Sequence, residues 1–86
     1  MRVILVFKER SEAAREAFEW MEEFRRRTGR EVEQLDPETR EGEEFCQARG
    51  IMEYPTLVVA ADDGNVVEQW SGRPMPIIDD IMAYVV

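Results

Sequence analysis

The sequence predicts an α/β domain in which a four-stranded mixed sheet is covered by helices on both faces, in the order β-α-β-α-β-β-α. Three observations lead to this prediction. Residues 2–8 and 56–61 are short apolar runs rich in β-branched side chains, which is typical of strands buried on both faces. Stretches with apolar residues at helical spacing separate the strand-like runs and follow the last one. Asp63-Gly64 stands between two such runs and indicates a hairpin.

The first half of the chain predicts a parallel β-α-β unit. Residues 2–8 form the first strand, which we place in the centre of the sheet. Ser11 is expected to cap the following helix, and Gly29 is expected to end it. Residues 31–35 alternate polar and apolar side chains, so they predict a more exposed edge strand parallel to the first. The helix should bury one broad stripe formed by Ala13, Ala14, Ala17, Phe18, Trp20, Met21 and Phe24.

A second, weaker helix is predicted to follow and to run up to residue 49. Asp36-Pro37 supplies a cap and a first-turn proline, which favour a helix start there. Gly42 lies inside the segment and weakens a helix, so a start nearer Glu41 is the alternative. Phe45 and Ala48 are the expected inward residues.

The last third of the chain predicts a hairpin and a final helix. Residues 56–61 and 66–70 should pair as antiparallel strands across the Asp63-Gly64 turn, because glycine accepts the positive φ that a tight turn requires. Pro76 is expected to open the last helix, since proline is favoured in a first helical turn. The apolar residues at helical spacing are Ile77, Ile78, Ile81, Met82, Tyr84 and Val85.

Size and charge limit the classes of function. With 86 residues we expect a single domain spanning 1–86. The chain carries 11 basic and 19 acidic residues, and its net charge of −8 opposes binding to nucleic acid and to anionic membranes. It contains no histidine, and its carboxylates are spread along polar helix faces, so no metal site is predicted.

Several features favour a monomeric cytoplasmic protein. No apolar stretch reaches the length of a membrane-spanning helix, and the first residues read as a buried strand rather than a signal sequence. The single cysteine, Cys46, cannot form an internal disulfide. Glu31 and Glu33 place charge on the predicted edge strand, which opposes edge-to-edge pairing of two copies.

The most distinctive motif is Tyr54-Pro55-Thr56-Leu57, in which a proline directly precedes a buried strand. A proline there donates no ladder hydrogen bond and restricts the residue before it. With the Asp63-Gly64 hairpin and Gly72 after the last strand, this motif makes the chain resemble the small thioredoxin-like and glutaredoxin-like proteins over essentially its whole length. The resemblance implies the thioredoxin-like fold, a cis bond before Pro55, and a groove beside Pro55 that holds a peptide or glutathione. The candidate binding residues are therefore Ser11, Tyr54, Pro55, Thr56 and Gly72.

The chemistry of that family is missing from this chain. The resemblance places the redox motif at Ser11-Glu12-Ala13-Ala14, where both cysteine positions are occupied by other residues. Ser11 would replace the nucleophilic cysteine and Ala14 the resolving one. A dithiol cycle needs a low-pKa thiolate and a second thiol, so no catalytic residue is predicted. Ser11 is interpreted as a helix cap, and a hydroxyl that holds a glutathione thiolate is the alternative.

Cys46 is interpreted as a packing residue rather than a reactive thiol. The resemblance places it in the second helix, away from the site beside Pro55. Its acidic neighbours Glu43 and Glu44 should raise the pKa of the thiol and oppose thiolate formation at neutral pH.

Three hypotheses about function follow. The first is a non-catalytic module that binds a protein or peptide, or a small ligand, beside Pro55. The second is a glutathione-binding protein, or a thiol-disulfide or glutathione-linked oxidoreductase, acting through Ser11 or through Cys46 as a single thiol. The third is a scaffold of unknown function with no ligand site. No cofactor is required by the first hypothesis, and glutathione is the ligand that the second implies.

Overall fold

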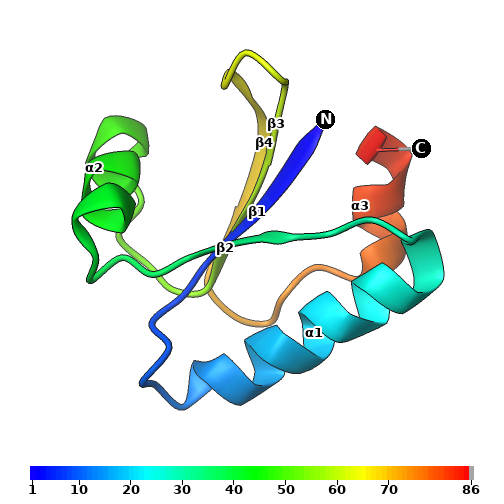
Figure 1. Ribbon diagram of the computed structural model, residues 1–86, viewed down its shortest axis with the longest axis horizontal. Helices are drawn as coiled ribbons and strands as arrows, with labels where there is room; N and C mark the ends of the chain where they lie inside the picture. The colour runs from blue at the N-terminus through cyan, green and yellow to red at the C-terminus, as the bar shows by residue number, and fades with distance from the viewer. Residues whose placement is uncertain (86) are drawn as a thin grey trace.

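The computed structural model describes residues 1–85, and its elements follow the predicted order β-α-β-α-β-β-α (Figure 1). The strands are β1 (Arg2–Val6), β2 (Glu33–Leu35), β3 (Thr56–Ala60) and β4 (Val66–Ser71). The helices are α1 (Ala13–Thr28), α2 (Arg40–Arg49) and α3 (Ile78–Val85). Every predicted strand and helix is present, and the differences concern where they begin and end.

The four strands form one mixed sheet in the order β2-β1-β3-β4. β1 is parallel to β2 and antiparallel to β3, and β3 is antiparallel to β4. The predictions of a central first strand, an edge position for β2 and a β3–β4 hairpin are therefore confirmed. Figure 1 shows α2 on one face of the sheet and α1 with α3 on the other.

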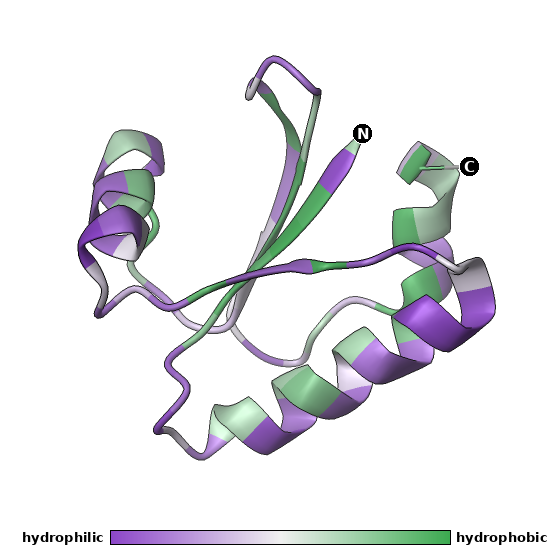
Figure 2. Cartoon of the chain, viewed as in Figure 1, coloured by the Kyte–Doolittle hydropathy of each residue, from purple (hydrophilic) through white to green (hydrophobic). Residues whose placement is uncertain are grey.

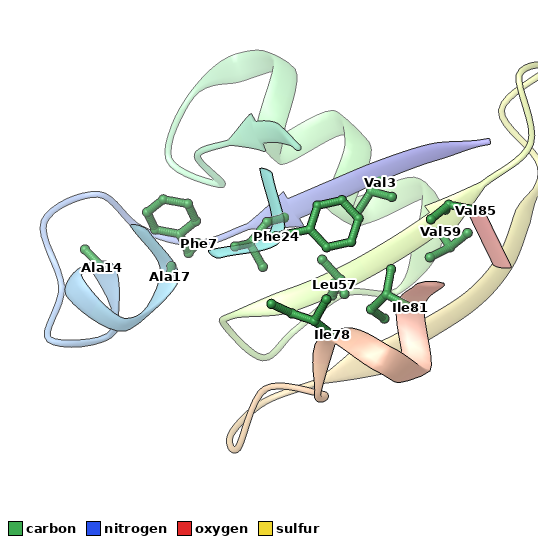
Figure 3. Packing of buried hydrophobic residues seen from close by; sticks show 11 residues of the cluster. Val3, Phe7, Ala14, Ala17, Phe24, Leu57, Val59, Ile78, Ile81 and Val85 are labelled. Carbon is green, nitrogen blue, oxygen red and sulfur yellow. The ribbon is translucent and has the colours of Figure 1, made fainter. Parts of the chain in front are cut away.

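The two sheet faces carry separate hydrophobic clusters because alternate residues of β1 and β3 point to opposite faces. Val3, Leu5, Leu57 and Val59 belong to the cluster beneath α1 and α3, whereas Ile4, Val6, Val58 and Ala60 belong to the cluster beneath α2. Figure 3 shows the first cluster, in which Phe7 lies beside Ala14 and Ala17 of α1. Figure 2 shows the contrast between the hydrophobic β1 and the hydrophilic β3–β4 turn.

The start of α1 differs from the prediction. The helix begins at Ala13, its N-cap residue is Glu12, and no side chain caps it. The Ser11 hydroxyl instead donates to the carbonyl oxygen of Lys8 at 2.6 Å. The prediction that Ser11 caps the helix is therefore wrong, because the helix begins one residue later than a Ser11 cap requires and Glu12 occupies the cap position. The predicted stop is confirmed, since Gly29 has a φ of 74° and donates to Arg25.

Helix α2 begins later than Asp36-Pro37 and close to the alternative start at Glu41. Its N-cap is Thr39, whose hydroxyl oxygen accepts from the Gly42 amide at 3.0 Å. Of the two expected inward residues, Phe45 is partly buried and Ala48 is exposed. The prediction for Ala48 is wrong because the buried face of the helix passes through Gly42 and Cys46.

Two other boundaries and the burial of one residue also differ from the predictions. β1 ends at Val6, although the Phe7 amide still donates to Leu35, and Lys8 is exposed. Phe18 lies at the margin of the α1 stripe and is 45% exposed, so its predicted burial is wrong. α3 begins at Ile78, two residues after Pro76. Within residues 1–85, no helix combines the length and the apolar character that a membrane crossing requires.

Candidate functional site

The candidate residues lie where three chain segments meet. These are the turn of residues 8–11 before α1, the loop of residues 53–55 before β3, and residues 72–73 directly after β4. The third segment is held against α1 by an ion pair of 3.4 Å between Arg73 and Glu16. The following residues are held by a hydrogen bond of 2.8 Å from the Trp20 indole to the Pro76 carbonyl. The sheet and α1 therefore fix the relative positions of the three segments.

Pro55, Thr56 and Gly72 form the inner part of the site. The side chains of Pro55 and Thr56 are fully buried. The Pro55 carbonyl accepts from the Gly72 amide at 2.8 Å, and the Thr56 hydroxyl donates to the Glu53 carbonyl at 2.6 Å. The Tyr54–Pro55 peptide bond is cis, as is the Arg73–Pro74 bond. Thr56 therefore serves to hold the loop, because its only side-chain donor is used within the protein.

Gly72 is required by both backbone conformation and space. Its φ is 76°, a region that side-chain-bearing residues rarely adopt. A β-carbon built on Gly72 would lie 2.7 Å from Oε2 of Glu53, which is closer than such contacts normally allow. Gly72 thus permits the segment after β4 to approach the loop before β3.

Tyr54 and Ser11 are connected through Lys8. The Lys8 ammonium lies 5.6 Å from the centre of the Tyr54 ring, within the range of a cation–π interaction. Ser11 binds the carbonyl of the same Lys8. The sequence interpretation missed Lys8 and Glu53, and the only available signal was their position, three residues before Ser11 and one residue before Tyr54.

The backbone of Tyr54 has unused hydrogen-bonding capacity. In the part of the chain that the structure describes, neither its amide nor its carbonyl forms a backbone hydrogen bond. The side chain is half-buried and packs against the cluster beneath α2. The Tyr54 amide and carbonyl therefore have hydrogen-bonding capacity that the described backbone does not use.

Ser11 and Ala14, the two positions aligned with the cysteines of a Cys-x-x-Cys motif, lie in different surroundings. Ala14 is buried in the cluster beneath α1, whereas Ser11 is exposed. Ala14 thus contributes packing and no polar atom to the surface of the site. The Ser11 hydroxyl hydrogen is already donated to Lys8, so it would have to leave this bond to hold a thiolate.

Cys46 lies on α2 in the cluster beneath that helix and is 5% exposed. Burial raises the pKa of the Cys46 thiol, while a hydrogen-bonding interaction with Tyr54 and the positive charge of Arg49 oppose that shift. The predicted direction of the shift is confirmed, but its cause is burial rather than the acidic neighbours. A neutral thiol is favoured, and it is a weak nucleophile.

Two surface hollows lie away from Pro55. One, of about 370 Å³, lies between β4 and α3, and the other, of about 70 Å³, lies near the β1–β2 edge. No residue of the 53–55 loop lines either hollow. Among residues 1–85, no group of three side chains is arranged to hold a metal ion.

Comparison with solved structures identifies the architecture. Thioredoxin 1 from the thermophilic eubacterium Thermosipho africanus TCF52B superposes with a TM-score of 0.74 and 12% sequence identity, over 99% of this chain and 94% of that one. A malarial protein superposes with a TM-score of 0.67 and 13% identity, over 96% of this chain and 90% of that one. No family model and no curated protein matches the sequence. The chain therefore has the thioredoxin-like fold, as its sequence predicted, with a single cysteine and no Cys-x-x-Cys motif.

Proposed function

We propose that this protein is a non-catalytic thioredoxin-like module that binds an extended protein or peptide segment beside Pro55. The observation that carries the proposal is the free backbone of Tyr54 next to the buried Pro55. A peptide running past this loop would find one donor and one acceptor from the main chain, the arrangement by which a strand is added to a protein. We place the protein in the cytoplasm as part of the same proposal.

The surroundings of Tyr54 support a peptide as the ligand. Met52, two residues earlier, is 87% exposed and offers a flexible apolar contact. The exposed Lys8 and Ser11 on the other side offer polar contacts. Backbone pairing at Tyr54 would supply affinity that does not depend on sequence, and these side chains would supply selectivity.

Thiol chemistry at this site has less support. Ser11 and Ala14 carry no sulfur, and the only thiol, on Cys46, is buried with a raised pKa. The donated hydroxyl of Ser11 also fits poorly with a role in holding the thiolate of glutathione. We therefore derive no catalytic step from glutathione. The scaffold hypothesis remains the outcome in which no ligand is found.

A titration followed by backbone amide NMR tests the proposal. The probes are a blocked, uncharged hexapeptide of alternating valine and serine, and reduced glutathione. We expect saturable shifts at Ser11, Tyr54, Thr56 and Gly72 with the peptide, and slower hydrogen exchange of the Tyr54 amide. Shifts with glutathione alone would instead support the glutathione-binding hypothesis. No shift with either probe at millimolar concentration would contradict the proposal and favour the scaffold.

Two proline variants separate binding from folding. Pro55→Ala adds a backbone donor and frees φ in the loop that presents Tyr54, so it should lower peptide affinity by about tenfold or more. Pro37→Ala is the matched control, because Pro37 is also buried but lies between β2 and α2. Both variants should lose stability in urea, and only the first should lose affinity. Equal affinity losses in the two variants would refute the role of Pro55.

A further inference from the structure

β4 is an edge strand whose outward backbone groups can be assigned from its pairing. Within residues 1–85, β4 pairs with β3 alone, and the residues opposite each other include Leu57 with Trp70 and Val59 with Glu68. The bond from the Gly72 amide to the Pro55 carbonyl continues this register by one more pair. Antiparallel pairs alternate between bonded and non-bonded positions. Trp70 and Glu68 are therefore bonded to β3, and Gln69 and Ser71 direct their amides and carbonyls to the free edge.

One of these outward groups is occupied by a side chain. The Gln69 amide donates to Oε1 of Glu68 at 3.0 Å. The other carboxylate oxygen of Glu68 lies 3.5 Å from the Tyr84 hydroxyl of α3. The Glu68 carboxylate thus sits across the edge and takes the place that the carbonyl of an added strand would occupy.

The larger surface hollow, of about 370 Å³, opens directly beside this edge. The Trp70 and Tyr84 rings in its wall meet edge to face, with centroids 5.7 Å apart. Asp79 is paired with Arg27 of α1 at 2.6 Å. Within residues 1–85, neither Glu68 nor Asp80 takes part in an ion pair. The hollow is lined by Glu68, Trp70, Asp79, Asp80, Ala83 and Tyr84.

We propose that an extended segment of a basic partner protein adds to the free edge of β4 as a fifth strand and places a lysine or arginine side chain in this hollow. The unpaired carboxylates and the aromatic rings both attract such a cation. When the cation pairs with Glu68, the carboxylate leaves the Gln69 amide, which then bonds to the added strand. The neighbouring Val66 and Val67, 40% and 43% exposed, supply apolar contact.

The charge of the chain favours a basic partner over a second copy. Two copies would each bring a net charge of −8 and a Glu68 carboxylate to the shared edge. A basic segment removes this repulsion and neutralises the hollow. This surface differs from the one beside Pro55, because its outward groups belong to Gln69 and Ser71 rather than to Tyr54.

The test uses the whole labelled protein and a blocked heptapeptide of alternating valine and lysine. We expect saturable shifts of the Gln69 and Ser71 amides and slower hydrogen exchange there. The same peptide with glutamate in place of lysine should not bind. The proposal is overturned if the lysine peptide causes no saturable shift at millimolar concentration, or if the shifts appear only around Tyr54. Concentration-dependent shifts without peptide, together with dimers in sedimentation, would show that a second copy occupies the edge and would also overturn it.

A pair of charge variants tests the role of the hollow. Asp80→Asn removes one of its unpaired carboxylates and should weaken binding of the lysine peptide by about threefold or more. Glu38→Gln removes the same charge from an exposed position between β2 and α2 and should leave the affinity unchanged. Thermal unfolding establishes that both variants fold. Equal effects of the two variants would mean that only net charge attracts the peptide, and this would refute the site.

Discussion

Replacing Gly42 by alanine should destabilise the protein, although alanine is the better helix former. A β-carbon at this position would lie 1.8 Å from the Asp36 carbonyl oxygen and 2.6 Å from its carbon. Ordinary contacts lie near 3.5 Å, so the backbone at Asp36 would have to move by about 1.5 Å or more. The same oxygen accepts from the Thr39 amide at 3.1 Å and from its hydroxyl at 2.7 Å. The displaced backbone would therefore strain both bonds.

The expected size of the effect follows from three contributions. Overpacking costs about 1 to 3 kcal/mol, and loss of the two hydrogen bonds at Asp36 costs about 2 kcal/mol. The higher helix propensity of alanine relative to glycine stabilises the helix by about 1 kcal/mol. We therefore expect Gly42→Ala to lower the free energy of unfolding by about 2 to 4 kcal/mol.

Urea unfolding followed by circular dichroism measures this difference. Ala48→Gly is the matched control, because Ala48 is an exposed residue of the same helix. This substitution changes helix propensity alone and should lower the free energy of unfolding by about 1 kcal/mol. A Gly42→Ala protein that is as stable as the parent, or more stable, would refute the reasoning. It would mean that the backbone at Asp36 can move aside without loss of stability.

Two further predictions concern titratable groups. The Cys46 thiol should be alkylated slowly at pH 7.5 in the folded protein and rapidly in urea, because it is buried and its pKa is raised. An alkylation rate in the folded protein equal to that of a free thiol would contradict this placement. Since the unfolded thiol loses its proton above pH ~8.5 while the folded one keeps it, stability should fall as pH rises beyond that value, and Cys46→Ala should reduce the fall. The hydrogen bond from Arg2 lowers the pKa of Glu33, so this pair stabilises the protein above pH ~4.3 and its effect is lost as pH falls through the lowered pKa. Glu33→Gln should therefore lower the free energy of unfolding by less than about 1 kcal/mol at pH 7 and leave it unchanged at pH 2. An equal decrease at both pH values would show that the ion pair is not responsible.

The sequence and the structure agree on the fold and differ over local detail. The order of elements, the central β1, the hairpin and the stop at Gly29 follow from local patterns of apolar residues, turns and glycine. The absence of a Cys-x-x-Cys motif is also evident in the sequence, because it depends only on which residues are present. These features could be predicted since each is decided within a few neighbouring residues.

The sequence alone determined the thioredoxin-like order of strands and helices and the absence of a Cys-x-x-Cys motif. Only the tertiary structure decided how the candidate site is built, because its contacts join residues far apart in the chain. Lys8 reaches Tyr54, and Gly72 binds Pro55. Gly42 looked like a weak point in a helix. The structure shows that the backbone of Asp36, in the turn that precedes the helix, occupies the space that a side chain at Gly42 would need.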